Sequence, residues 1–227
     1  MTKRNPSRPS PGRAGVLVLA AAAAIAPAGC AVPTLVGGMA ESYKRTSTHS
    51  IPSEYDGLKD KSFAVIVAAE RMIQSSRPQE VARLTTLITE RLITSADAAG
   101  VVPPSVVLGY QYNHPRWVTM TYDELAEEFG VERLVYVDLY EFRLNDPGNA
   151  YLWGGQAAAT VGVVEADGPL GDEFVYSKQI SVHFPDEDGY GPTDYTGEQI
   201  AAVLEKRFVD RLTWLFYDHQ EPYYPDY

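Results

Sequence analysis

The feature that most constrains the fold is a short apolar run, SFAVIVAA, at Ser62–Ala69. A strand with one solvent-exposed face alternates polar and apolar residues, whereas a nearly continuous run of apolar residues is typical of a strand covered on both faces. We therefore expect a central strand here, with helices packed on its sheet. The chain has 227 residues, which is enough for one sizeable hydrophobic core.

Three segments have the pattern of helices that begin at a capping box. In a capping box, a Ser or Thr side chain and a Glu or Gln three residues later satisfy free N–H groups at the helix start. Gly100 and Gly130 are placed to end the first two helices. The pairs are Ser76 with Gln79, Thr121 with Glu124, and Thr196 with Gln199; the apolar stripes of the first and last helices are Val81, Leu84, Ile88, Leu92 and Ile200, Leu204, Phe208, Leu212, Leu215.

Four further segments have strand patterns. Val106–Leu108 is a brief apolar run after two prolines, and Tyr151–Glu165 and Glu173–Phe184 are longer strands separated by turn residues. Arg133–Arg143 alternates, with Leu134, Tyr136, Asp138, Tyr140 and Phe142 on one side. The order β-α-β-α-β-β-β-α predicts a single α/β (α+β) domain, a mixed sheet packed by helices and ending in an antiparallel meander.

The first 29 residues have the outline of a secretory signal peptide. A basic stretch precedes an apolar run of 11 residues, Val16–Ala26, which is too short to span a bilayer that needs about 20. Cys30, the only cysteine, follows Pro27-Ala28-Gly29. This segment resembles the lipobox of bacterial lipoproteins, in which a cysteine after small residues receives a diacylglyceryl group. The resemblance implies a membrane anchor through acyl chains on Cys30.

We divide the chain into four parts. They are a signal peptide at 1–29, a lipidated flexible tether at 30–57, an α/β domain at 58–218 and a Tyr- and acid-rich tail at 219–227. The tether contains Gly, Pro, Ser and Thr without an apolar period. Ala31 stands where well-studied lipoproteins carry an aspartate resembling an inner-membrane retention signal. We therefore expect the periplasmic face of the outer membrane.

The charge distribution excludes one class of partner. Residues 1–29 contain four basic residues and no acidic one, so the rest of the chain carries 15 basic against 30 acidic residues. Phosphate backbones bind proteins chiefly through Lys and Arg, so we expect no nucleic-acid partner. A single cysteine also excludes an internal disulfide and a cysteine-based metal site.

No catalytic or cofactor motif is present, and we expect neither an enzyme nor a cofactor. The four histidines, at 49, 114, 183 and 219, are scattered, so we expect no metal site. Asp186–Gly189 is acidic, but aligning its glycine with an EF-hand puts Tyr195 where an acid is required. Strand alternation places Asp138 and Glu141 on opposite faces, where they cannot act together on a glycan.

The aromatic residues say more about function than the histidines and acidic residues do. Tyr and Trp combine a large contact area with a polar group, so clusters of them suit interfaces. The alternative is that they seal the edge of the sheet. The candidates for a partner surface are Tyr110, Tyr112, Trp117 and Tyr122, and a second group of tyrosines crowds the carboxyl-terminal end.

The succession of a lipidated cysteine, a tether, a strand-helix pair and the segment EEFGVERLVYVDLYEF resembles a group of bacterial envelope lipoprotein domains. The group includes the curli secretion lipoprotein CsgG, the penicillin-binding-protein activator lipoproteins and the amino-terminal domain of TolB. The resemblance covers about Lys59–Tyr217. It implies a non-enzymatic binding or assembly component of an envelope complex for secretion, wall synthesis or transport. It also implies an envelope protein partner and allows a homo-oligomer.

Two alternatives remain open. One is an enzyme that acts on envelope glycans through carboxylates not visible as a motif, which would need two acids in one cleft. The other is a subunit of an outer-membrane secretion pore. The chain has no spare pair of amphipathic strands for a barrel, so we rank the pore below a binding role.

Overall fold

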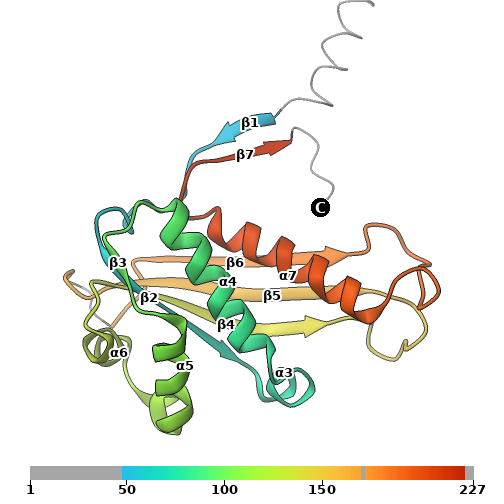
Figure 1. Cartoon of the computed structure of the whole chain (residues 1–227), viewed down its shortest axis with the longest axis horizontal. Coiled ribbons are helices and arrows are strands. Elements are labelled where there is room, and N and C mark those ends of the chain that lie inside the picture. The colour runs from blue at the N-terminus through green and yellow to red at the C-terminus, as the bar shows by residue number, and fades with distance from the viewer. Residues whose placement is uncertain (1–47, 170–171, 223–227) are drawn as a thin grey trace, which may run out of the picture. The chain divides into compact units, whose positions relative to one another are not determined.

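The computed structural model describes residues 48–169 and 172–222. Their main feature is a five-stranded mixed sheet with the strand order β3-β2-β4-β5-β6 (Figure 1). Two short strands, β1 and β7, form a separate two-stranded sheet. The strands are β1 at Thr48–Ile51, β2 at Ser62–Ala69, β3 at Gly100–Val101, β4 at Arg133–Arg143, β5 at Gly155–Glu165, β6 at Tyr176–Phe184 and β7 at His219–Pro222. The helices are α3 at Arg71–Ser76, α4 at Glu80–Ser95, α5 at Pro104–Asn113, α6 at Tyr122–Phe129 and α7 at Gly197–Thr213, with a 3-10 helix, η1, at Pro115–Thr119.

The predicted central strand is confirmed. β2 pairs in parallel with β3 and with β4, and β4, β5 and β6 continue as an antiparallel meander. The side chains of Phe63 to Val67 are at most 1% exposed, as expected for a strand covered on both faces. The expected α+β class, with a mixed sheet packed by helices, is therefore confirmed.

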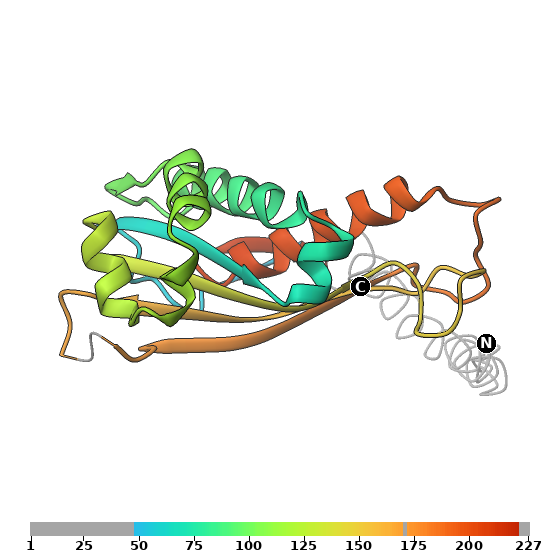
Figure 2. The same ribbon diagram turned by 90° about the horizontal axis from the view of Figure 1, so that it is seen from below.

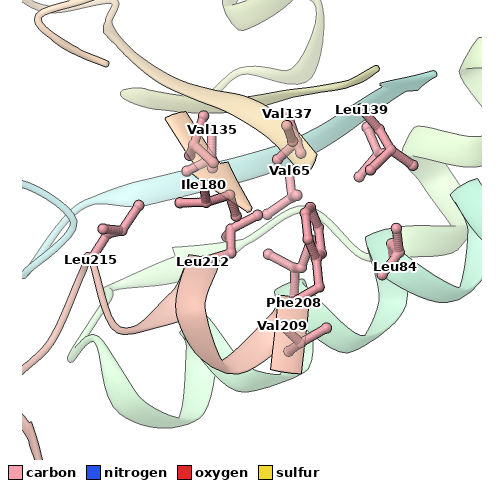
Figure 3. Packing of buried hydrophobic residues seen from close by; sticks show 14 of the residues in the cluster. Val65, Leu84, Val135, Val137, Leu139, Ile180, Phe208, Val209, Leu212 and Leu215 are labelled. Carbon is pink, nitrogen blue, oxygen red and sulfur yellow. The ribbon is translucent and has the colours of Figure 1, made fainter. Parts of the chain in front are cut away.

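Helices α4 and α7 cover one face of the sheet and enclose the main core. Figure 2 shows both helices on the same side of the strands. Leu84 of α4 and Phe208 and Leu212 of α7 pack toward Val135 and Val137 of β4 (Figure 3). Each of these side chains is fully buried, and burying such a side chain contributes about 1.5–3 kcal/mol.

The opposite face of the sheet is only partly covered. Residues from α5, η1 and α6 form a second core against Ile66 and Leu134. Over β5 and β6 this face carries the buried Ala158 and Val164 together with polar side chains that are exposed or half-buried. They include Gln156, Thr160, Ser177, Gln179, Ser181 and His183.

A β-bulge overturns the predicted alternation of β4. The register with β5 shifts between Leu139 and Glu141, so Tyr140 is an extra residue. Beyond it, Phe142 lies in the main core, on the side opposite to that predicted. An inserted residue reverses the period-two alternation, which the sequence pattern alone does not reveal.

The predicted capping box at Ser76 is wrong. Ser76 ends α3, where its hydroxyl donates to the Met72 carbonyl at 2.9 Å. α4 begins at Glu80 after Gln79, whose side chain makes no capping hydrogen bond. The helix itself and its stripe are as predicted, but it ends at Ser95, and Gly100 opens β3 instead of ending the helix.

The predicted strand at Val106–Leu108 is also wrong, because these residues lie in α5. Pro104 occupies the first turn, where its fixed φ favours a helix and its missing N–H costs nothing. Val107 is buried in the second core. A three-residue apolar run cannot distinguish a strand from one turn of helix.

The other two capping boxes are confirmed, at Thr121 for α6 and at Thr196 for α7. Gly130 ends α6 in the left-handed region with φ of 63°, a conformation that glycine adopts without strain. β5 and β6 begin at Gly155 and Tyr176, a few residues later than the predicted strands.

The folded region extends beyond the predicted 58–218. Residues 50–57 were expected to belong to a flexible tether, but Tyr55 stacks on Tyr176 with 5.6 Å between ring centres. Its hydroxyl donates to Glu165 at 2.8 Å. At the other end, His219–Pro222 forms β7 instead of a tail. The signal peptide, Cys30, most of the tether and residues 223–227 lie outside the described residues.

Buried Arg133 joins the start of β4 to the segment before β2. Its Nε donates to the Gly57 carbonyl at 3.0 Å, and one terminal nitrogen donates to the Glu132 carbonyl at 2.7 Å and to Asp167. Lys61 also pairs with Asp167 at 2.8 Å. Together, Lys61 and Arg133 lower the pKa of Asp167 to about 2.

Within the described residues, no helix is long and apolar enough to cross a membrane.

Candidate functional site

The structure divides the predicted aromatic cluster into buried and exposed parts. Tyr110 stacks on His114 with 4.4 Å between ring centres, and its hydroxyl donates to the Met120 sulfur at 3.2 Å. Tyr122 packs against Tyr136 and Phe174, at 5.1 and 4.6 Å between ring centres. These two tyrosines therefore help to build the second core. This role corresponds to the alternative in which the aromatic residues seal the sheet instead of contacting a partner.

Tyr112 and Trp117 lie instead at a groove of about 260 Å³ between α5 and the α3–α4 segment. Tyr112 is 85% exposed, whereas Trp117 is buried and contributes to the wall. Gln111 fixes α5 here, because its amide donates to the Val67 carbonyl of β2 at 3.2 Å. The full lining is Val67, Gln74, Pro78, Val81, Ala82, Leu108, Gln111, Tyr112 and Trp117.

Further apolar side chains are exposed elsewhere on the elements that form this groove. Met72 of α3 is 77% exposed, Val118 of η1 is 61% exposed and Val106 of α5 is 51% exposed. Leu87 of α4 lines a neighbouring hollow that shares Ala82 with the groove. We call the surface formed by the groove lining and Leu87 the α4–α5 surface. Exposed apolar surface of this kind, rimmed by polar residues, is typical of protein interaction sites.

A second, larger groove of about 1050 Å³ lies where α4 and α7 begin. It contains two buried carboxylates that the sequence pattern did not single out, Glu80 and Glu205. Arg83 donates to Glu205 at 2.6 Å, and Arg77 contacts Glu80 at 3.4 Å. Burial and the nearby charge of Glu205 raise the pKa of Glu80 to about 7, while the two arginines act in the opposite direction.

The position of these carboxylates indicates a structural role. The second oxygen of Glu80 is buried and has no hydrogen-bond partner, so it is not presented to a molecule in the groove. The arginine of α4 neutralises Glu205 of α7, which links the two helices. A sequence signal existed, since both acids stand on helices beside apolar positions, but their burial depends on how the helices pack.

The β4 bulge changes the relation between Asp138 and Glu141. They pair with Thr160 and Ala158 of β5, which both lie on the face away from the main core, so the predicted opposite orientation is wrong. Glu141 accepts a hydrogen bond from Arg143 at 2.7 Å. This shared face is one of the arrangements that a glycan-acting enzyme would need.

The other candidate ligand residues are separate or neutralised. Among residues 48–169 and 172–222, no three His, Cys, Asp or Glu side chains gather in the way a metal site requires. In the acidic loop, Arg207 of α7 holds Asp186 through two hydrogen bonds of 2.6 and 2.8 Å. That ion pair lowers the pKa of Asp186. It fixes the start of the loop against α7.

Comparison with known proteins gives structural similarity at low sequence identity. The PelC dodecamer from Paraburkholderia phytofirmans is 12% identical, with 75% of this chain and 97% of that chain covered and a TM-score of 0.44. Lipoprotein GNA1162 from Neisseria meningitidis is 13% identical, with 66% and 96% covered and a TM-score of 0.44. The LpoB C-terminal domain from Salmonella enterica is 14% identical, with 57% and 87% covered and a TM-score of 0.33. No protein-family model and no curated protein matches the sequence.

Proposed function

We propose that this chain is a lipid-anchored protein of the bacterial cell envelope that binds an envelope protein through its α4–α5 surface and has no catalytic role. The observation that carries the binding role is Tyr112, a large aromatic side chain that stands 85% exposed at the rim of an apolar groove. A tyrosine left in water at such a rim provides contact area without a large entropic cost, since it has few rotatable bonds. The leader and Cys30 support the anchored location.

The partner that suits this surface is a protein with an apolar helix or loop. The groove is lined mostly by apolar and small side chains, with no charged residue among them. A charged ligand would find no side chain of opposite charge in this lining. An apolar side chain would displace water from Val81, Ala82 and Leu108, each of which lines the groove.

Photo-crosslinking in intact cells tests whether a partner covers Tyr112. We expect a photoreactive phenylalanine at position 112 to give a discrete adduct, because a bound partner would cover this side chain. The same residue at Glu198, an exposed position of α7, is the control and should give none. Adding Ala82→Glu to the position-112 variant places a charge in the groove and should remove the adduct. An adduct that survives this change, or equal adducts at 112 and 198, would contradict the proposed surface.

The anchor is tested separately at Cys30. We expect Cys30→Ser to abolish labelling by a fatty-acid analogue and to release the protein from membranes or leave its leader uncleaved, because the thiol is the acceptor of the acyl chain. Loss of labelling without release would limit the anchor's importance, and an unlabelled wild type would contradict lipidation. Fractionation of the two cell membranes would show whether the anchored form lies in the outer membrane.

A further inference from the structure

The free edge of β6 adjoins a groove that the proposed function does not use. Among the described residues, β6 pairs with β5 on one side and with no strand on the other. A groove of about 410 Å³ runs along this edge, between β6 and the last turns of α7. Its lining is Ile51, Pro52, Glu54, Lys178, Gln179, Ile180, Ser181, Arg211, Trp214, Leu215, His219 and Glu221.

The hydrogen-bond pattern identifies which backbone groups of β6 face outward. Only every second residue of an edge strand bonds to its neighbour in an antiparallel ladder. The carbonyl of His183 accepts a hydrogen bond from Arg207 at 2.7 Å, so His183 belongs to the outward-facing set. By the same alternation, Ser177, Gln179 and Ser181 present their N–H and C=O groups at the free edge. These groups are the ones that another strand would pair with.

The charged residues of the groove already have partners. Lys178 contacts Glu54 at 3.0 Å, and Arg211 contacts Glu221 at 2.9 Å. Tyr176 also donates to Glu54, at 2.9 Å. These opposite charges balance, so the groove is close to neutral and does not demand a charged side chain inside it.

The remaining lining is suited to apolar side chains. Ile51, Leu215 and the Trp214 ring contribute apolar surface, and the Trp214 and His219 rings stack in parallel with 4.5 Å between their centres. A strand laid along β6 would direct alternate side chains toward α7, since successive residues of a strand point to opposite faces. Those side chains would enter this groove.

We propose that the β6 edge binds an extended segment of a basic partner protein, which adds a sixth strand to the sheet and places apolar side chains in the groove beside Trp214. The charge of the molecule selects the partner. Residues 30–227 carry 15 basic against 30 acidic residues, so a basic segment is attracted and a second copy of the same chain is repelled. Main-chain pairing of this kind provides affinity, and pockets for alternate side chains provide specificity.

The test uses the full-length chain in detergent and a synthetic nonapeptide of alternating valine and lysine. We expect the peptide to bind, as measured by fluorescence anisotropy. We also expect the bound peptide to protect the amides of Ser177, Gln179 and Ser181 from hydrogen exchange. A counterpart with glutamate in place of lysine should bind at least about tenfold more weakly. This measurement needs no variant, so it stands even if a β6 substitution fails to fold.

Two substitutions at one position separate the backbone from the side chain. Gln179→Pro removes an outward N–H without removing a bond to β5, and it should weaken peptide binding at least about tenfold. Gln179→Ala keeps the N–H and should change binding less than about threefold. Absence of binding, absence of amide protection or equal effects of the two variants would overturn the proposal. So would a dimer that forms without peptide and is broken by Gln179→Pro, because the occupant would then be a second copy. None of these outcomes depends on Cys30 or on the α4–α5 surface.

Discussion

Replacing Arg133 with methionine should lower the free energy of unfolding by about 2–4 kcal/mol. The side chain is 6% exposed and donates to the Gly57 and Glu132 carbonyls and to Asp167. Methionine keeps much of the volume but removes the donor to the Gly57 carbonyl and the buried ion pair, whereas Asp167 keeps Lys61 and the Glu132 carbonyl keeps the Ala166 N–H. The loss should be smaller than for a fully buried pair, because Asp167 remains partly in water.

Urea denaturation at neutral pH measures this effect, and Lys61→Met provides a matched control. Lys61 also pairs with Asp167, at 2.8 Å, but it lies at the surface. Solvent screens such a pair, so its removal should cause a much smaller change. If the two variants were equally stable, Arg133 would not be the residue that fastens the segment before β2 to the sheet.

Replacing Glu80 with glutamine should stabilise the protein at pH 8.5 by about 1–3 kcal/mol and have little effect near pH 5. The pKa of Glu80 is raised to about 7 from its ordinary 4.5, chiefly by burial. Between these two values the folded state keeps the proton and the unfolded state loses it. The wild type therefore loses stability as the pH rises from about 4.5 to about 7, whereas glutamine stays neutral throughout.

Thermal unfolding of wild type and Glu80→Gln across pH 5–8.5 tests this prediction. Glu198→Gln removes an exposed charge from the rim of the same groove and should show no comparable increase with pH. The ion pairs of Glu54, Asp167 and Asp186 lower the pKa of these groups, so their contribution is lost only at lower pH. A stability difference that did not change with pH would mean that Glu80 is solvated like an ordinary surface carboxylate.

The sequence predicted the elements whose signals are local. β2 was recognisable because a continuous apolar run suits a strand covered on both sides. The starts of α6 and α7 were recognisable because the capping boxes at Thr121 and Thr196 bond within one turn of helix. Each signal lies within a few residues, so no distant contact was needed to read it.

The candidate site was only partly predictable, because the exposure of a side chain is not a local signal. Composition indicated that aromatic residues gather between Tyr110 and Tyr122, but not which of them remain exposed. Tyr110 and Tyr122 are taken up by the second core, whereas Tyr112 points away from it and is exposed. Exposure depends on which helix face meets the sheet, and the sequence pattern predicted a strand at Val106–Leu108, where α5 lies instead.

By itself the sequence determined the class of fold, its central strand, two helix starts and the acidic character of the body, because these follow from local patterns and from composition. The tertiary structure alone decided three other features. The bulge at Tyr140 reversed the faces of β4, and the packing of α4 against α7 buried Glu80 beside Glu205. The sheet also ends at β6, which has no second strand partner among residues 48–169 and 172–222. Each of these depends on residues far apart in the chain that meet only after folding, so no pattern within one segment encodes them.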